Sequence, residues 1–284
     1  MAGQDKIIPI DTMIPMDTVI PEDAVSQEEA MQCWDEAAEE FADRFKRNEE
    51  FFHKHVINPT LLDLLGDVKG KAVLDVACGE GHFSRKLAEQ ANGDIQITGI
   101  DASKRLIDIA QKKNKQFSDC IRFQVGDAGR LDELTPNSFD VAVCNMALMF
   151  IKRFEEAIQE IARVLKPQGL FVFSLLHPCF LTPGSGWILE DSPDKKKGKR
   201  IGWKTDNYYL RLVYHGVMTV CDTKETYYFC RTLEDYFRAL RGGGFVVEDL
   251  REPLPPKELM ERHPNFKGEE KRSLILIMKC KRVG

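Results

Sequence analysis

A glycine-containing turn follows an apolar run early in the chain, in the stretch VLDVACGEGHF at residues 73–83. Turns of this kind begin several cofactor sites, including those that hold a pyrophosphate. The dinucleotide pattern G-x-G-x-x-G is incomplete, because Gly79 and Gly81 are present but residue 84 is serine. Asp75 lies inside the end of the apolar run, where its carboxylate repels a pyrophosphate and attracts a cation. The turn therefore predicts a site for a positively charged ligand.

Two further carboxylates end later apolar runs. Asp101 in GIDAS comes 20 residues after Gly81, the spacing at which an acidic side chain accepts hydrogen bonds from ribose hydroxyls. Asp127 in VGDA is suited to accept a hydrogen bond from the exocyclic amine of adenine, and the small Ala128 leaves room for the ring. Each aspartate alone is equally typical of a solvated turn or a helix N-cap. Together with the glycines, the three carboxylates favour a site for a nucleoside with a positive charge.

The pattern of apolar residues predicts the strands and helices that position these residues. Runs such as AVLDVA, QITGI and DVAVC are apolar almost throughout, as strands covered on both faces must be. Strands are predicted at 71–77, 94–100, 121–126, 139–145, 169–176, 245–250 and 273–281, with helices near 82–91, 103–116, 153–166 and 232–241. The alternation predicts an α/β fold with a doubly wound parallel sheet, whose ligands bind at the carboxyl ends of the strands.

The motifs VLDVACGEGHFSRKLA, GIDAS, VGDA, FDVAVCNMAL and LKPQGLFVFSL resemble, in order and spacing, those of class I S-adenosylmethionine-dependent methyltransferases of the small-molecule type. The resemblance extends from about Lys71 to Leu176 and resumes at the C-terminus. It implies a Rossmann-like, doubly wound, mostly parallel seven-stranded sheet with helices on both faces and an antiparallel strand near its edge. It also implies S-adenosylmethionine as the cofactor.

The resemblance implies roles for particular residues. The loop residues lie against the methionine part of the cofactor, the acid after the second strand holds the ribose diol, and the acid after the third frames the adenine. An aromatic residue on an N-terminal helix covers the cofactor, although ordinary core packing would give the same helical spacing. The family often has glycine where this chain has Ala77. The expected cofactor-binding residues are Trp34, Asp75, Ala77, Cys78, Gly79, Gly81, Asp101, Ala102, Asp127, Ala128 and Asn145.

The first 26 residues differ from the rest of the chain. They contain three consecutive six-residue units, IPIDTM, IPMDTV and IPEDAV. Each proline favours extended backbone in the residue before it and removes a hydrogen-bond donor, and three such units bury too little surface to fold alone. We expect residues 1–26 to form an extended tail that docks on the domain or on a partner, and residues 27–284 to form the methyltransferase domain.

Helical periodicity begins at Gln27, with Trp34, Phe41, Phe45 and Phe52 on one stripe. A second short helix is predicted at 59–65.

The segment 179–230 is too long for a connection between a strand and a helix. YYLRLVYHG and TKETYYFC alternate as two antiparallel strands do, so the segment is predicted to be an inserted cap over the strand ends. Its aromatic side chains suit a small organic substrate, or they form the core of the cap without touching a ligand. The run KKKGKR at 195–200 is more typical of a solvated loop tip than of a phosphate site.

Methyl transfer from a sulfonium is a displacement that needs a general base only when the acceptor starts protonated. His177, just past the fifth strand, is the first candidate for that base, and Tyr214 and His215 in the cap are further candidates. Histidine before a proline at a strand end is as often structural. Asn145 is not followed by the Pro-Pro-aromatic pattern of methyltransferases that act on nucleobase or glutamine amines, which disfavours those substrates.

Composition narrows the choice of partners. The formal net charge of −5 gives no general attraction to a phosphate backbone, so nucleic acid is an unlikely partner. Eight cysteines without a C-x-x-C pair predict reduced packing thiols, no metal site and a cytoplasmic location. No apolar run is long enough to span a membrane. A small-molecule methyltransferase is favoured over an RNA or protein methyltransferase, and over a cofactor-binding protein without catalysis.

Overall fold

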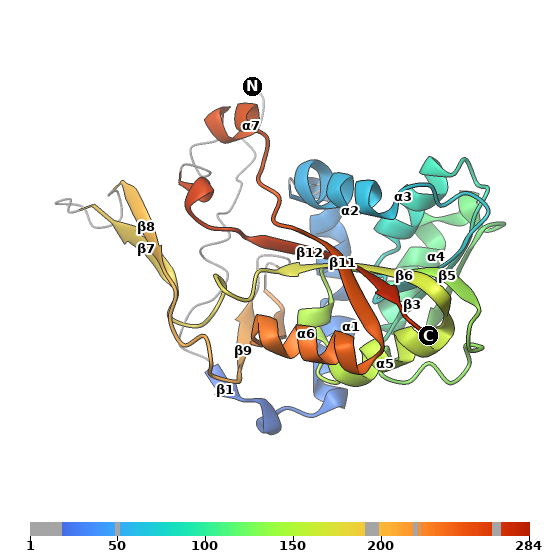
Figure 1. Ribbon diagram of the computed structural model, residues 1–284, viewed down its shortest axis with the longest axis horizontal. Helices are drawn as coiled ribbons and strands as arrows, with labels where there is room; N and C mark the ends of the chain where they lie inside the picture. The colour runs from blue at the N-terminus through green and yellow to red at the C-terminus, as the bar shows by residue number, and fades with distance from the viewer. Residues whose placement is uncertain (1–18, 49–51, 191–198, 218–220, 222, 263–267) are drawn as a thin grey trace.

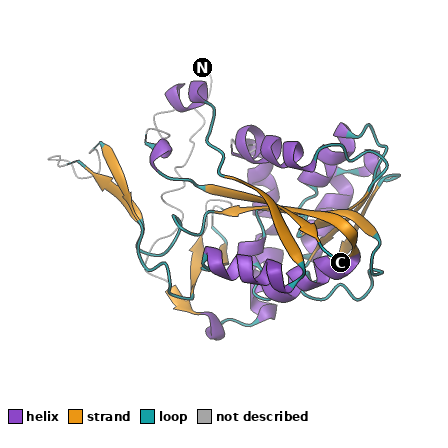
Figure 2. Ribbon diagram, in the orientation of Figure 1, coloured by secondary structure: helices purple, strands orange, loops and turns teal. Residues whose placement is uncertain are grey.

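The centre of the molecule is a seven-stranded sheet (Figures 1 and 2). The computed structural model describes residues 19–48, 52–190, 199–217, 221, 223–262 and 268–284, with side chains at 44–48 and 262 excluded. In sheet order, its strands are β11 (Phe245–Arg251), β12 (Ile275–Arg282), β6 (Leu165–Leu176), β5 (Phe139–Asn145), β2 (Ala72–Val76), β3 (Gln96–Asp101) and β4 (Ile121–Val125).

Strands β2 to β6 are mutually parallel, and β12 runs antiparallel to both β6 and β11. The chain passes from β2 to β3 and β4 on one side, and then returns to β5 and β6 on the other. Strand β2 therefore stands at the switch point, where a crevice opens beyond the carboxyl ends of the strands. The predicted doubly wound, mostly parallel sheet is confirmed.

Helices cover the sheet on both faces. Figure 1 shows α2 and α3 on one side of the sheet, with α5 and α6 on the other. Each presents an apolar stripe to the strands; in α5, for example, Ala157, Ile158 and Ile161 are fully buried. The helices are α2 (Asn58–Leu65), α3 (His82–Gln90), α4 (Lys104–Lys113), α5 (Phe154–Val164) and α6 (Leu233–Gly242).

The segment between β6 and α6 contains two antiparallel pairs. Strands β9 (Leu212–Val217) and β10 (Glu225–Phe229) form the pair that the alternation predicted. The sequence analysis missed the other pair, β7 (Gly186–Leu189) with β8 (Arg200–Lys204), which extends away from the sheet in Figure 2. Most of the KKKGKR run, at 195–198, lies outside the described residues.

The N-terminal part of the described chain joins this segment. Strand β1 (Val19–Pro21) pairs antiparallel with β9, so the last residues of the predicted tail form the edge of a three-stranded sheet (Figure 1). Residues 1–18, which hold most of the hexapeptide repeat, lie outside the described residues.

Helix α1 (Gln27–Asn48) follows β1 and contacts α4 and β10. Phe52 lies beyond the end of α1 rather than on it, next to a π-helical turn at His53–Ile57, and the side chain of Phe45 lies outside the described set.

The state of the cysteines agrees with the sequence analysis. All eight cysteines are free thiols, as predicted, and Cys144 and Cys280 are completely buried in the main core. Among the residues that the structure describes, no helix combines the length and apolar character that crossing a membrane requires.

A candidate cofactor and active site

The loop after β2 adopts a backbone conformation that favours glycine. Ala77, Gly79 and Gly81 all have positive φ angles, of 53°, 56° and 78°. A Cβ atom on Gly81 would lie 2.6 Å from the side chains of Asn114 and Phe123, so residue 81 must lack a side chain. The loop therefore turns tightly from β2 into α3 and leaves its backbone open toward the crevice.

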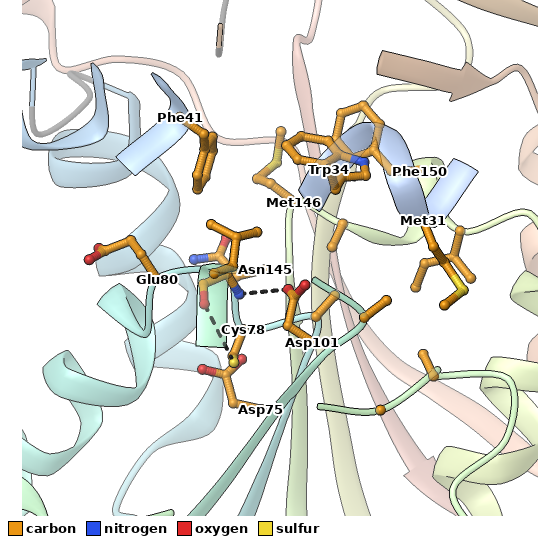
Figure 3. Close-up of a pocket in the computed structure, with 18 of the residues that line it drawn as sticks. Met31, Trp34, Phe41, Asp75, Cys78, Glu80, Asp101, Asn145, Met146 and Phe150 are labelled. Carbon is orange, nitrogen blue, oxygen red and sulfur yellow. Dashed lines mark hydrogen bonds between the residues drawn. The ribbon is translucent and has the colours of Figure 1, made fainter. Parts of the chain in front are cut away.

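A pocket opens beside this loop at the carboxyl ends of β2, β3, β4 and β5 (Figure 3). Its lining contains every expected cofactor-binding residue except Gly81, which shapes the turn behind it. The residues that the pocket brings together are Trp34, Asp75, Ala77, Cys78, Gly79, Asp101, Ala102, Asp127, Ala128 and Asn145.

Asp75 is the most buried of the three carboxylates, with 1% of its surface exposed. The Ser84 hydroxyl donates a hydrogen bond to Asp75 Oδ2 at 2.6 Å. Burial, with a contribution from the nearby Asp101 charge, raises the pKa of Asp75 to about 7 despite that hydrogen bond. A cation in the pocket would favour the ionised carboxylate and lower this pKa again.

Asp101 joins the loop to the end of β3. Its Oδ2 accepts a hydrogen bond from the backbone N–H of Gly79, and its Oδ1 accepts one from the backbone N–H of Ser103, both at 2.9 Å. Burial raises the pKa of Asp101 to about 6. The two backbone donors fix the carboxylate at the pocket wall, where its remaining lone pairs can accept hydrogen bonds from a ligand.

Asp127 follows β4 and lines the same pocket. Its Oδ1 accepts hydrogen bonds from the Gly129 N–H at 2.9 Å and from Gln27 Nε2 at 3.3 Å. Its Oδ2 lies 3.2 Å from Arg153, which forms an ion pair with it. Gln27 belongs to α1, so this carboxylate connects the N-terminal helix to the end of β4.

A buried polar network supports the pocket beneath Asn145. The Ser174 hydroxyl donates to Asn145 Oδ1 at 2.8 Å, and Asn145 Nδ2 donates to Asn58 Oδ1 at 3.3 Å. Asn58 Nδ2 in turn lies 2.8 Å from His82 Nε2. Burial, with a contribution from His53, lowers the pKa of His82 to about 3, so this ring is neutral.

The sequence analysis missed His53, Asn58 and His82. His82 lies inside the motif VLDVACGEGHFSRKLA but was given no role there, whereas His53 and Asn58 precede the motifs along the chain.

Helix α1 lies over the pocket with an aromatic face. Trp34 makes edge-to-face contacts with Phe41 and Phe150, at ring-centroid distances of 5.7 and 4.9 Å. Phe41 lies over the loop, where a Cβ atom on Gly79 would be in ordinary van der Waals contact with its ring at 3.5 Å. In Figure 3 these rings and Met146 lie opposite Asp75 and Asp101. The pocket therefore has one carboxylate-bearing side and one apolar side.

A polar contact anchors α1 to the rest of the domain. Asp35 Oδ1 accepts hydrogen bonds from the Ser103 hydroxyl at 2.7 Å and from the Arg105 N–H at 2.9 Å. Ser103 is the N-cap of α4 and follows Asp101 by two residues. The contact thus joins the aromatic helix to the segment that carries the second carboxylate.

None of the three residues expected to act as bases lines the pocket. His177 is buried, with its Nε2 2.8 Å from Glu252 and its Nδ1 accepting from the Cys179 N–H, and burial lowers its pKa. Tyr214 is 1% exposed within the core. His215 stacks on Tyr227 at a centroid distance of 4.2 Å. The structure buries His177 and Tyr214, leaves His215 half-buried, and places all three outside the pocket lining.

The aromatic residues of the cap do not line the pocket, but one of them contacts a residue that does. Tyr228 contacts the pocket-lining Phe150 edge-to-face at 6.1 Å. On the β7–β8 hairpin, Trp187 and Trp203 pack against each other and against the guanidinium of Arg272. No residue of 179–230 that the structure describes lines the pocket, so the described part of the cap supports its wall rather than forming it.

Comparisons with known proteins agree with this geometry. Residues 67–179 match the family model described as a methyltransferase domain. A ubiquinone biosynthesis O-methyltransferase of Coxiella burnetii is 35% identical over 131 residues, covering 44% of this chain and 53% of that enzyme. A demethylmenaquinone methyltransferase of Leptospira interrogans is 29% identical over 175 residues, covering 60% of this chain and 63% of that enzyme. This chain thus matches only about half to three fifths of their length.

A crystal structure shows the same fold over more of the chain. The S-adenosylmethionine-dependent methyltransferase from Mesorhizobium loti has a TM-score of 0.64 and 25% identity, covering 79% of this chain and 96% of that chain. The family match includes the loop after β2 and the carboxylates at the ends of β3 and β4. Residues 67–179 therefore form a methyltransferase domain with the class I fold of S-adenosylmethionine-dependent methyltransferases, and S-adenosylmethionine is the cofactor.

Proposed function

We propose that this protein transfers the methyl group of S-adenosylmethionine to a small, planar, largely apolar organic acceptor. The observation that carries the proposal is the two-sided pocket, in which the carboxylates of Asp75 and Asp101 lie opposite an apolar wall. That wall consists of side chains with large contact surfaces and no charge: Met31, Trp34, Phe41, Met146 and Phe150. Such a wall suits a flat ring better than a polynucleotide or a peptide chain.

The pocket residues fit the cofactor by their chemistry. Asp101, fixed by two backbone donors, would accept hydrogen bonds from the ribose hydroxyls. Asp127 would accept from the adenine amine, beside the small side chains of Ala102 and Ala128. The loop from Asp75 to Gly81 would lie against the methionine part, where the carboxylate of Asp75 favours the positive sulfur. Asn145 and Trp34 complete the lining around these groups.

When bound, the cofactor supplies a methyl carbon that is already activated by its positively charged sulfur. The chain has to hold the acceptor atom in line and keep water out, and such positioning can contribute about 7 to 11 kcal/mol. The aromatic side of the pocket, closed by α1, excludes water from the reacting atoms. Its rings also restrict a flat acceptor to a few orientations.

The histidines that the structure places near the pocket bear on the choice of acceptor. His82 lines the pocket, but its low pKa and its hydrogen bond to Asn58 make it a poor base at neutral pH. His177 is buried against Glu252, outside the pocket lining. His53 also lines the pocket and is the histidine that could act as a base there. We favour an acceptor that loses its proton readily, such as an acidic ring hydroxyl or a stabilised carbanion, because such an acceptor makes the smallest demand on a base.

The relatives support this class of acceptor. Their names assign them to the biosynthesis of ubiquinone and to the methylation of demethylmenaquinone. A quinone-type ring is planar and apolar, and its hydroxylated precursors carry acidic protons. These properties match the apolar wall of the pocket. The free thiols of all eight cysteines also support a cytoplasmic location.

The proposal is tested with methyl-tritiated S-adenosylmethionine and a cell extract. The parent protein should transfer label to material that passes a small-pore filter and extracts into organic solvent. Asp101→Ala is the control, because loss of the ribose acceptor should weaken cofactor binding by about 2 to 3 kcal/mol and abolish transfer at low cofactor concentration. Label retained on the filter and released by nuclease or protease would instead indicate an RNA or protein acceptor. Cofactor binding without any transfer would indicate a non-catalytic member of the fold.

A further inference from the structure

Gln27 is a pocket residue to which no role has been assigned so far. It is the first residue of α1 and lies on the same face of the helix as Ala30, Met31 and Trp34, all of which line the pocket. Its Nε2 donates a hydrogen bond to Asp127 Oδ1 at 3.3 Å and lies 3.4 Å from the sulfur of Met31. The side chain therefore lies beside the carboxylate that follows β4.

The contact with Asp127 fixes the orientation of the Gln27 carboxamide. An ionised carboxylate accepts hydrogen bonds and cannot donate, so the amide N–H₂ must face Asp127 and the carbonyl oxygen must face away. That oxygen, Oε1, is buried and has no hydrogen-bond partner among the described residues. A buried acceptor without a donor is unfavourable, and a ligand that brings a donor to it would relieve the cost.

We propose that Gln27 recognises the 6-amino group of the adenine ring together with Asp127. This inference rests on the placement of adenine in the proposed function. The amino group has two N–H bonds, and the site offers two kinds of acceptor for them, the carboxylate of Asp127 and the carbonyl oxygen of Gln27. The pocket lining also includes the small side chains of Ala102 and Ala128 and the apolar side chain of Ile151, which leave room for a purine and a surface for it to contact.

The inference gives α1 a second function besides covering the pocket. Gln27 is two helical turns from Trp34 on the same face, so a hydrogen bond to adenine holds the helix that carries the aromatic wall. Binding of the correct base would thus stabilise the closed position of Trp34 and Phe41. A purine with an oxygen at position 6 would place a hydrogen-bond acceptor against the carboxylate of Asp127 and the carbonyl oxygen of Gln27. Neither group can donate to it, so the hydrogen bonds of the amino group would be lost.

The test compares two ligands by titration calorimetry, without any methyl acceptor. The ligands are S-adenosylhomocysteine and S-inosylhomocysteine, which differ at purine position 6. The variant is Gln27→Met, which keeps the length and apolar packing of the side chain but removes both polar atoms. Gln32→Met is the matched control, because Gln32 is exposed on the same helix and bonds only to Glu36 among the described side chains. Thermal melts without ligand check that both variants fold.

We expect Gln27→Met to lose about tenfold in affinity for S-adenosylhomocysteine and less than about twofold for S-inosylhomocysteine. Gln32→Met should bind both ligands like the parent. Unchanged binding of both ligands by Gln27→Met would contradict the proposal, and so would an equal loss for both, which would indicate packing of α1 alone. Asp127→Asn tests the placement of adenine separately, because it should also reduce the preference for the adenine ligand. A parent protein that binds neither ligand would contradict the proposed function itself.

Discussion

At the scale of single residues, the site depends on carboxylates kept in unfavourable surroundings. Asp75 and Asp101 are both buried in the pocket wall, and burial raises the pKa of each, to about 7 and about 6. A cation between them and the apolar wall would restore the ordinary preference for the ionised forms. The two buried carboxylates destabilise the unliganded protein. A positively charged ligand would remove this destabilisation, which favours its binding.

The first prediction concerns the stability of Asp75→Asn without cofactor. Because the folded-state pKa of Asp75 is raised from 3.8 to about 7, its contribution to stability is fully present below pH 3.8 and is lost as the pH rises through 7. The parent should lose about 2 to 3 kcal/mol from this group between pH 5 and pH 8. The introduced carboxamide cannot ionise, so the variant should not show this loss. Urea unfolding at both pH values measures the difference.

Asp119→Asn provides the control for this experiment, since Asp119 is an exposed carboxylate next to β4. Its substitution should change stability by a similar small amount at both pH values. If Asp75→Asn showed the same pH dependence as the parent, the assignment of a raised pKa to Asp75 would be wrong.

At the scale of elements, α1 forms one side of the pocket. It contacts the domain through Gln27 at one end, Asp35 near its middle and Phe41 beyond. The contact of Asp35 is with the N-cap of α4, two residues after Asp101. We therefore expect a change in this contact of α1 to affect the pocket through α4 and Asp101.

The second prediction is that Asp35→Ala binds S-adenosylhomocysteine more weakly, by about three- to tenfold, mainly through faster dissociation. The substitution removes the acceptor of two hydrogen bonds that hold α1 over the pocket, so the helix should open more often. Stopped-flow measurement of intrinsic tryptophan fluorescence during ligand release follows this opening, because Trp34 lines the pocket whereas Trp187 and Trp203 lie on the β7–β8 hairpin. Asp43→Ala, an exposed position on the same helix, should release the ligand at the parental rate, and equal rates for all three proteins would show that the Asp35 contact has no such role.

At the scale of the whole molecule, the N-terminal strand is part of the cap sheet. β1 pairs with β9 of the cap, and Val25 packs with Ala30, Val213 and Phe229 in a separate small core. The predicted boundary after residue 26 therefore falls between residues that pack together, although the assignment of residues 1–26 as a tail remains a prediction for the undescribed residues 1–18.

The third prediction compares two N-terminal truncations. A chain that starts at residue 19 keeps β1, whereas a chain that starts at residue 27 loses β1 and the buried Val25. The shorter chain should be less stable than the longer by about 2 to 4 kcal/mol, because burial of one such apolar side chain alone is worth about 1.5 to 3 kcal/mol. Denaturant unfolding of both chains measures this. Equal stabilities would mean that β1 contributes nothing to the fold.

The sequence by itself determined the sheet and most of the cofactor pocket. Apolar runs and amphipathic stretches are local patterns, and they located the strands and helices of the sheet closely. Parallel strands bring their carboxyl ends to one edge, so the ends of β2, β3 and β4 had to place Asp75, Asp101 and Asp127 together. The glycines of the loop are also a local signal, because the tight turn requires positive φ at Gly79 and Gly81.

Only the tertiary structure decided what surrounds those carboxylates and which polar side chains reach the pocket. Gln27 meets Asp127 from 100 positions away in the chain, and His177 meets Glu252 from 75 positions away. No local period encodes such contacts, because they depend on how α1 and the β11–β12 end of the sheet pack. The same packing buried Tyr214 in the core and left His177 outside the pocket lining, whereas it brought His53 and His82 to the pocket. Proximity along the chain fixed the elements, but long-range packing fixed the partners of each side chain.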